Sequence, residues 1–304
     1  MTAKREKRIS YALLVFPAVA IYLAVVTFPT IFSIVLSFTN YNGGPVFGPN
    51  ANIEFVGFNM YRWMFTEPTR GFFLSFRNNM LIVAVSVFGQ IPLGFILAYI
   101  ISRKLIRRGR AFFQSMIFLP FVISPVIIGV LFNVFIRSPQ SVLIEVAGFL
   151  GIAQMDVVTW LLRNPMIPVL AVILWMFTGF YMVIFIAHFN RIDPEVIEAA
   201  RIDGSSEGRI LTRIVLPLMS NEIITMSILA ISGSLRTFDL IYVMTAGGPA
   251  GQTRVLSLFM YQSAFQAAAN YPLANAISTV MVLTSILLII IVRAIGKYLS
   301  RNVY

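Results

Sequence analysis

A short charged segment, residues 193–204, separates two very apolar stretches of the chain. Asp193 is suited to cap a helix here, Pro194 fits its first turn, and Glu195 favours the positive end of the helix dipole. Gly204 suits the other end, because glycine readily adopts the left-handed conformation that ends many helices. The segment therefore predicts a short helix, polar enough to lie in water, between two apolar elements.

The middle of this helix carries side chains that favour contact with another surface. Ala199 and Ala200 are small enough to let the helix lie close against a neighbour, and Glu198 beside them offers a carboxylate. Val196 and Ile197 fall on the same face as Ala200, since residues three and four apart are neighbours on a helix. The chemistry that this pattern indicates is docking rather than catalysis.

Catalytic and metal-binding chemistry has no comparable basis in the sequence. Cysteine is absent, which excludes disulfides, zinc–thiolate sites and thiol catalysis. The single histidine, His188, ends an apolar run, so an interfacial position is a better prediction than a metal site. No stretch reads G-x-x-x-x-G-K followed by Ser or Thr, and no nucleophile, histidine and carboxylate are arranged as in an active site. We therefore expect a protein that is not an enzyme and that holds neither a metal nor a cofactor.

The composition predicts a membrane protein. Of the 304 residues, 58% are hydrophobic and 12% are charged, and the mean hydropathy is +0.85. A soluble domain carries about twice that charged fraction. Apolar runs long enough to cross a bilayer, about 20 residues each, cover Tyr11–Phe38, Met80–Ser102, Phe112–Phe135, Met166–Phe189, Leu216–Leu240 and Leu273–Val292. We expect an all-α membrane protein with six transmembrane helices.

The basic residues predict the orientation of these spans. A net charge of +11 favours nucleic-acid binding in a soluble protein, but here Lys and Arg gather at the ends of the apolar runs. Sixteen of them lie in segments on one side of the membrane, and six lie in the loops on the other side. The positive-inside rule then places both termini and residues 193–204 in the cytoplasm. The basic run Lys4–Arg8 precedes no small-residue cleavage site, so we expect a retained first span and no nucleic-acid partner.

Two spaced motifs resemble those of a known family. Residues 198–204 read E-A-A-x-x-x-G, and after nine further residues Ile214–Pro217 read I-x-L-P. The combination resembles the EAA loop of binding-protein-dependent ABC importer permeases. In that family the loop is the coupling helix, which docks into a groove on the cytoplasmic ATPase, so the resemblance implies a coupling helix at about residues 193–205. The coupling residues that it implies are Glu198, Ala199, Ala200, Asp203, Gly204 and Pro217.

A turn-rich segment farther along the chain resembles one sub-family of these permeases. Residues 240–249 read L-I-Y-V-M-T-A-G-G-P, and they are followed by Thr253, Leu256, Tyr261 and Ala264–Phe265. This segment, the Gly-Gly-Pro loop, resembles the outer loop of the first of the two permeases in carbohydrate-type importers, the maltose, glycerol-3-phosphate and multiple-sugar relatives. Two departures occur: no second proline follows Pro217 within a few residues, and the large outer domain of the enterobacterial maltose permease is absent.

The resemblance also implies a domain organisation. Residues 1–75 are expected to form an N-terminal transmembrane helix and an extracytoplasmic loop, residues 76–293 a type I ABC importer transmembrane domain, and residues 294–304 a short cytoplasmic tail. In the outer loops we expect a short amphipathic piece at Phe58–Phe65 and an interfacial helix around Val142–Leu150.

The partners follow from the same resemblance. It implies a second permease, so that the pair is a heterodimer, together with two copies of an ABC ATPase that bind ATP and Mg. It also implies an extracytoplasmic sugar-binding protein and a place in the cytoplasmic membrane of a bacterium or archaeon. Transport would proceed by alternating access.

The path of the substrate is expected on the fourth and fifth spans. Aligning both motifs to the maltose-type permeases places their sugar-contacting positions on Ile173, Met176, Phe177, Phe180, Ala230, Gly233 and Ser234. Aromatic faces and hydroxyls suit a sugar, whose C–H faces stack while its hydroxyls need hydrogen bonds. Stripes of this kind are also typical of plain packing between spans, which is the competing interpretation.

The fifth span also carries charges. Arg236 lies 19 residues beyond Pro217, about 28 Å along a helix, so Arg236 and Asp239 are expected near the outer surface and Glu222 near the inner one. Arg236 and Asp239, three residues apart, are spaced to pair on one helix face. An interfacial role is therefore predicted for these three residues.

Other functions remain open at this point. An amino-acid, peptide or phosphate permease of the same superfamily has a similar EAA loop, and the Gly-Gly-Pro loop argues against it. A secondary transporter or channel without an ATPase predicts mid-membrane carboxylates or inverted repeats, and neither is evident. An intramembrane enzyme is disfavoured because the catalytic residues are missing.

Overall fold

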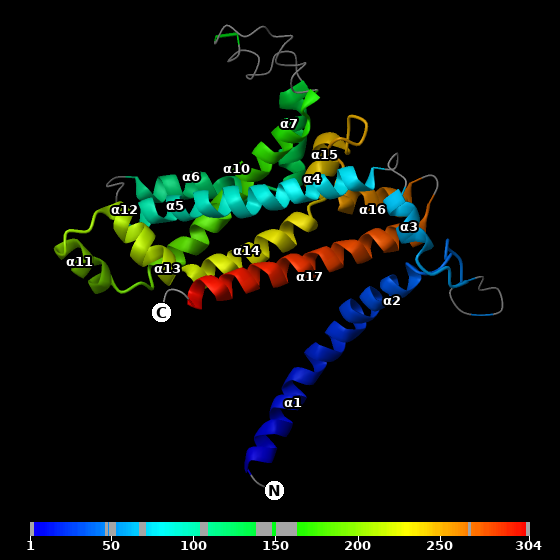
Figure 1. The fold of residues 1–304 in the computed structure, drawn as a ribbon, viewed down its shortest axis with the longest axis horizontal. Coiled ribbons are helices and arrows are strands. Elements are labelled where there is room, and N and C mark those ends of the chain that lie inside the picture. Colours follow the sequence, from blue (N-terminus) through cyan, green and yellow to red (C-terminus); the bar gives the residue numbers. More distant parts are fainter. Residues whose placement is uncertain are drawn as a thin grey trace. The chain divides into compact units, whose positions relative to one another are not determined.

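The regular structure is helical in the part of the chain that is described here from a computed structural model, namely residues 3–45, 48, 53–66, 71–103, 109–137, 148–149, 163–266 and 269–301. Within these ranges the extended structure is a single isolated antiparallel bridge between Thr39 and Phe55. Two compact units are present (Figure 1). Unit 1 contains residues 1–70 and 259–282, and unit 2 contains residues 71–258 and 283–304.

Unit 1 is built from an N-terminal helical rod and from segments near the other end of the chain. The rod consists of α1 (Ala3–Tyr22), the π-helical turn η1 (Leu23–Thr27) and α2 (Phe28–Leu36), and the remaining helices are α3 (Asn59–Thr66), most of α16 (Leu256–Phe265) and the first part of α17 (Tyr271–Arg301). The Ser33 hydroxyl donates to Asn275 Oδ1 at 2.7 Å, and Ser37 shares a 2.6 Å hydrogen bond with the Tyr61 hydroxyl. The amphipathic piece predicted at Phe58–Phe65 is confirmed as α3.

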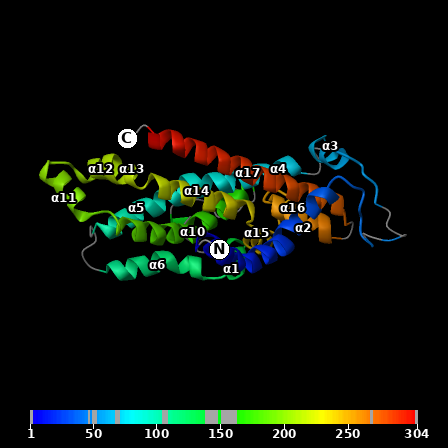
Figure 2. The same ribbon diagram turned by 90° about the horizontal axis from the view of Figure 1, so that it is seen from below.

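Unit 2 is organised around α10 (Met166–Phe189), which packs against α5 (Ile91–Ser102) and α6 (Arg110–Val122) (Figures 1 and 2). Gly179 is needed at the α6 contact, because a Cβ there would lie 2.2 Å from the Ile117 carbonyl oxygen. The other elements are α4 (Phe72–Val85), η3 (Ser86–Gln90), α7 (Pro125–Arg137), α11 (Pro194–Ile202), α12 (Glu207–Ile210), η4 (Leu211–Val215), α13 (Leu216–Leu218), α14 (Ser220–Leu235) and α15 (Asp239–Thr245).

Among the described residues, each of the three π-helical turns, η1, η3 and η4, ends two residues before a proline. The prolines Pro29, Pro92 and Pro217 are the second residues of α2, α5 and α13. A proline lacks the N–H of a normal helical bond, and its ring collides with the carbonyl group four residues earlier. In each case the preceding residue bonds five residues back, as Ile91 N–H does to Ser86 O. The wider turn absorbs the proline and lets the helix continue.

Two predicted spans are not continuous helices. The predicted span Phe112–Phe135 is broken into α6 and α7, which meet at 91°. The break follows from Pro125, because the residue before a proline disfavours helical backbone and proline donates no hydrogen bond. The predicted span Leu216–Leu240 is broken as well: α14 begins at Ser220 and ends at Leu235, and it meets the preceding helix at 71°.

The remaining four spans are continuous. Helices long and apolar enough to cross a membrane occupy Ser10–Leu36, Phe72–Ser102, Met166–Phe189 and Tyr271–Lys297. The other three start earlier than predicted, whereas the span from Met166 to Phe189 agrees at both ends. The described residues therefore contain four candidate spans, or six if each bent pair counts as one. The helix predicted around Val142–Leu150 lies almost entirely outside the described residues.

The orientation of the spans is a prediction that fusion reporters test. A reporter fused after Arg108 or Arg201 should be cytoplasmic, and one fused after Gly57 or Gly248 should be external. Sixteen Lys and Arg residues lie on the side of the membrane that contains the first pair of positions, and six lie in the loops on the other side. Paired phosphatase and β-galactosidase fusions measure this directly. A cytoplasmic signal from the Gly248 fusion would show that the span count or the orientation is wrong.

Candidate functional site

The predicted coupling helix is present as α11 (Pro194–Ile202), and its N-terminus is capped as the sequence indicates. Asp193 Oδ1 accepts a hydrogen bond of 3.0 Å from the backbone N–H of Glu195. Pro194 occupies the first helical position, where its missing N–H costs nothing. The start of the helix is therefore fixed by local contacts alone.

The C-terminus of α11 is closed by the predicted glycine. Gly204 has φ +75°, which is the left-handed region that side chains disfavour. Its N–H donates to Arg201 O at 3.0 Å, and the N–H of Ser205 donates to Ala200 O at 3.0 Å. These two bonds form the Schellman arrangement, which satisfies the last carbonyl groups of the helix. The prediction that Gly204 ends the helix is confirmed.

One face of α11 is anchored in the core of unit 2. Ile197 is 3% exposed and Ala200 is 8% exposed, and both belong to a buried cluster that includes Tyr99, Phe189 and Val215. These three neighbours come from α5, α10 and η4. Val196, predicted on the same face, is instead 44% exposed. The helix is thus held against the ends of two candidate spans by two apolar side chains.

The opposite face of α11 is open to solvent. Glu198, Ala199 and Asp203 are all exposed, and Ile202 is 86% exposed although it is a large apolar side chain. Pro217, the last predicted coupling residue, lies in α13 and is half-buried. The predicted coupling helix therefore has a buried face, formed by Ile197 and Ala200, and an exposed face that carries Glu198, Ala199 and Asp203.

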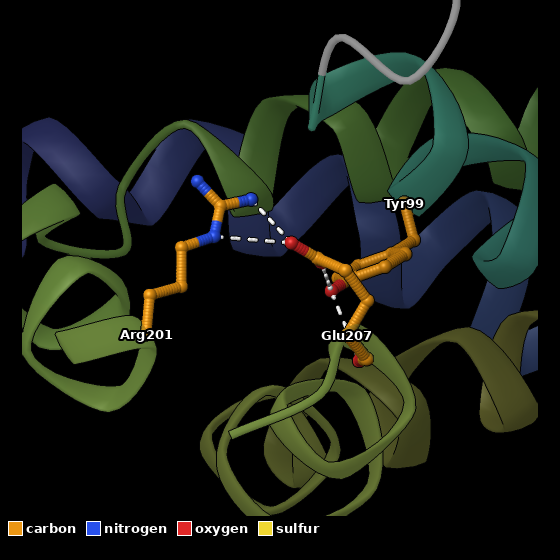
Figure 3. Close-up of polar contacts among 3 residues, drawn as sticks. All are labelled: Tyr99, Arg201 and Glu207. Carbon is orange, nitrogen blue, oxygen red and sulfur yellow. Dashed lines mark hydrogen bonds and ion pairs between the residues drawn. The ribbon is translucent and has the colours of Figure 1, made fainter. Parts of the chain in front are cut away.

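A polar bridge joins α11 to α5 (Figure 3). The Tyr99 hydroxyl donates to Glu207 Oε2 at 2.6 Å, and Arg201 Nε donates to Glu207 Oε1 at 3.1 Å. An ion pair also joins Arg201 Nη2 to Glu207. The hydrogen bond to Glu207 raises the pKa of the Arg201 guanidinium above its ordinary value. Sequence analysis missed this bridge, because no spacing pattern links Tyr99 to a glutamate 108 residues away.

Four of the seven predicted substrate-path residues are buried within the chain: Ile173, Met176, Ala230 and Ser234. Gln90 Nε2 donates to Ile173 O at 2.7 Å, and the Ser234 hydroxyl donates to Ser86 Oγ at 2.9 Å. The Ser234 hydroxyl is therefore already used in a contact between α14 and η3. The structure brings Ile173 and Met176 together on α10 and Ala230 and Ser234 together on α14.

The other three path residues are more accessible. Phe177 and Phe180 are half-buried and lie against Phe121, with ring centroids 5.9 and 4.8 Å apart respectively. Gly233 is exposed, and a Cβ at this position would meet nothing within 4 Å. Their contact with a substrate remains a prediction.

The Gly-Gly-Pro loop is held by two buried asparagines of α4. Asn78 Nδ2 donates to the carbonyl oxygens of Gln252 and Arg254 at 2.8 and 2.9 Å. Asn79 Oδ1 accepts from the Leu256 N–H at 2.7 Å. Inside the loop, the Thr253 hydroxyl donates to Gly248 O at 2.8 Å. The predicted span begins at Met80, so the sequence did not place these two amides inside an apolar helix, where α4 buries them and where buried amides need partners.

The charged residues of the fifth span are arranged differently from the prediction. Arg236 and Asp239 do not share a helix face, because α14 ends at Leu235 and Asp239 begins α15. Arg236 Nε instead donates to Ser232 O at 3.2 Å. Glu222 Oε1 lies 3.6 Å from His188 Nδ1, a contact that the sequence did not predict. Among the described residues, no group of three or more His, Cys, Asp and Glu side chains is placed to hold a metal ion.

The comparison with known proteins identifies the family. Residues 90–303 match the family of binding-protein-dependent transport system inner membrane components, and the chain belongs to that family. The probable ABC transporter permease protein YurN of Bacillus subtilis (strain 168) is 31% identical over 288 residues, which cover 93% of this chain and 94% of the relative. The chain is thus an ABC importer permease and a multi-pass membrane protein, as the EAA motif predicted.

One further sequence relative and one solved structure are similar to this chain. The multiple sugar-binding transport system permease protein MsmF of Streptococcus mutans is 29% identical over 256 residues, covering 84% of this chain and 83% of the relative. A solved bacterial alginate ABC transporter, in complex with an alginate pentasaccharide-bound periplasmic protein, contains a chain with a TM-score of 0.79. The two chains are 20% identical, with 97% of this chain and 96% of that one covered, so this likeness concerns the fold.

Proposed function

We infer that this chain is a transmembrane subunit of an ATP-driven importer for a sugar or sugar-like solute, working in the cytoplasmic membrane by alternating access. The observation that carries the inference is the two-faced helix α11. Its buried face, Ile197 and Ala200, contacts the ends of α5 and α10, while Glu198, Ala199 and Ile202 face solvent. A helix anchored to candidate spans and exposed on its far side is suited to pass movement from a docked protein into the membrane.

The proposed partners follow from that face and from the family. Two copies of an ATPase would supply the energy, each docking on one permease, with the exposed face of α11 as the contact in this chain. A second permease would complete the pathway between the two subunits, and an extracytoplasmic binding protein would deliver the solute. The Tyr99–Glu207–Arg201 bridge supports this arrangement, because it ties the end of α11 to α5 independently of the apolar anchor.

A carbohydrate substrate is supported by two observations. MsmF, which is similar over most of its length, has a name that specifies multiple sugars. The aromatic rings of Phe177 and Phe180 remain half-buried rather than fully packed, and such rings suit the C–H faces of a sugar. Because the named relatives are less than a third identical, the particular sugar is not specified by them.

The proposal is tested by uptake in cells of the source organism that lack this chain. We expect uptake of at least one labelled sugar to fall to background and to return with the wild-type chain, while amino-acid uptake is unchanged. Transport should stop when cellular ATP is depleted and should persist when an ionophore collapses the ion gradients. Uptake that follows the ion gradient instead would identify a secondary transporter. Loss of amino-acid uptake alone would exclude the carbohydrate assignment.

A further inference from the structure

A small cavity lies at the end of α5, beside the first turn of α11. Its volume is about 210 Å³, and its polar lining includes Ser102, Arg103 and Asn190. Phe189 and Ile197 form part of its apolar lining. The cavity lies outside the predicted substrate path, whose residues are on α10 and α14, and neither the coupling motif nor the Gly-Gly-Pro loop accounts for it.

The cavity contains hydrogen-bond donors without acceptors. Across the described residues, five buried side-chain polar atoms lack a hydrogen-bond partner, and three of them belong to residues that line this cavity. They are Ser102 Oγ and the Nε and Nη2 atoms of Arg103. Tyr99, also in the lining, already donates its hydroxyl proton to Glu207. Arg103 is half-buried and also interacts with Tyr99, but its Nε and Nη2 atoms are buried without an acceptor. Leaving such donors unpaired is costly, so the arrangement calls for an acceptor.

The geometry points to a phosphate-type oxyanion as the ligand, and we propose that this cavity binds one. The Nε and Nη atoms of arginine form a planar fork that matches two oxygens of a tetrahedral anion. The Ser102 hydroxyl is a third donor on the same lining, and the apolar wall lowers the local dielectric, which strengthens charged hydrogen bonds. The phosphate group is shared by inorganic phosphate and by the headgroup of an anionic phospholipid, and these are the two sources to distinguish.

An anion in this cavity would join two elements of unit 2. Arg103 directly follows α5, whereas Pro194 and Ile197 in the same lining belong to α11. Occupancy would therefore brace α11 against α5 beside the Tyr99–Glu207 contact. The binding itself does not depend on the proposed transport function, so its test uses binding measurements on the full chain.

The test uses the purified full chain in nanodiscs of phosphatidylcholine. Inorganic phosphate is titrated at constant ionic strength against chloride, and the midpoint of thermal unfolding is recorded. A second arm uses nanodiscs that contain phosphatidylglycerol, with native mass spectrometry counting the retained anionic lipid. A saturable rise of the midpoint with phosphate assigns the site to the free anion, and selective retention of phosphatidylglycerol assigns it to the lipid headgroup.

Three variants define the site. We expect Arg103→Gln to weaken the response to the effective probe at least about tenfold, because charge-assisted hydrogen bonds are lost. Ser102→Ala should weaken it about threefold, since one neutral donor is removed. Arg209→Gln is the matched control: it removes the same charge from an exposed position outside the cavity, and it should leave the response unchanged.

Other results would contradict the phosphate site. If wild type shows neither a saturable phosphate response nor selective lipid retention, the cavity is not a phosphate site. Equal loss in Arg103→Gln and Arg209→Gln would show only diffuse attraction between a basic protein and anions. If Arg103→Gln fails to insert, the wild-type titration and Ser102→Ala still decide the matter.

Discussion

Gly204→Asp is expected to lose most of its uptake while the chain stays in the membrane at its normal level. Gly204 adopts φ +75° at the end of α11, and a side chain in that region costs about 1–2 kcal/mol. A Cβ at this position would meet nothing within 4 Å, so the substitution disturbs the backbone rather than the packing. The strain falls on the Ser205–Ala200 hydrogen bond that closes the helix, and it shifts the exposed face that the proposal assigns to the ATPase.

A matched control separates backbone strain from added charge. Gly208 is also exposed with open space around its Cβ position, but it lies inside α12 and has no positive φ. Gly208→Asp should therefore keep near wild-type uptake. Uptake is measured with the sugar identified by the deletion strain, and membrane levels by immunoblotting. Equal uptake by Gly204→Asp and wild type would remove the argument that the end of this helix matters for coupling.

The local features of α11 could be predicted because they depend on residues close in sequence. Asp193 caps the helix two residues ahead of its hydrogen-bond donor, and Gly204 closes it through bonds that span three to five residues. Rules for capping residues and for glycine operate over this range. The Tyr99–Glu207 contact could not be predicted, since it depends on how α5 and the loop after α11 meet in space.

The bends of the apolar segments were only partly predictable. Pro125 lies between α6 and α7 and marks the 91° break, whereas Pro92 is absorbed by the turn η3 and leaves a span that continues from α4 to α5. Both prolines remove a backbone donor. Whether the helix breaks or widens depends on its neighbours, because packed helices can satisfy the freed backbone groups. Hydropathy therefore located the apolar segments better than it predicted their continuity.

The substrate path was the least predictable part of the site. Helix α10 is apolar all round, so its periodicity does not reveal which face is buried. Alignment to relatives selected Ile173 and Met176, which the structure buries inside the chain, together with Phe177, which it leaves half-buried. By contrast, a polar residue within an apolar span, such as Gln90, is informative, because it must find a partner within the protein, here the Ile173 carbonyl oxygen.

Glu198→Ala should strongly reduce the coupling of ATP hydrolysis to uptake while leaving expression near normal. The Glu198 side chain is exposed in the middle of α11. If it only paired with a neighbour on its own helix, its loss would cost about 0.2–0.5 kcal/mol, too little to affect activity. If it meets a basic or amide group on the proposed ATPase, truncation of a buried charge pair costs about 2–5 kcal/mol. That difference exceeds tenfold in affinity.

The decisive measurement is ATPase stimulation by the loaded binding protein in reconstituted vesicles, together with co-purification of the ATPase. Glu195→Ala is the matched control, because Glu195 is an exposed glutamate in the first turn of the same helix. Its loss removes only a favourable interaction with the helix dipole, about 0.3–1 kcal/mol, and should leave most of the stimulation intact. Full stimulation and full transport in Glu198→Ala would make Glu198 a solvated surface residue. The docking face would then depend on Ala199 and on Ile202, a large apolar side chain that is 86% exposed and that a docked partner would cover.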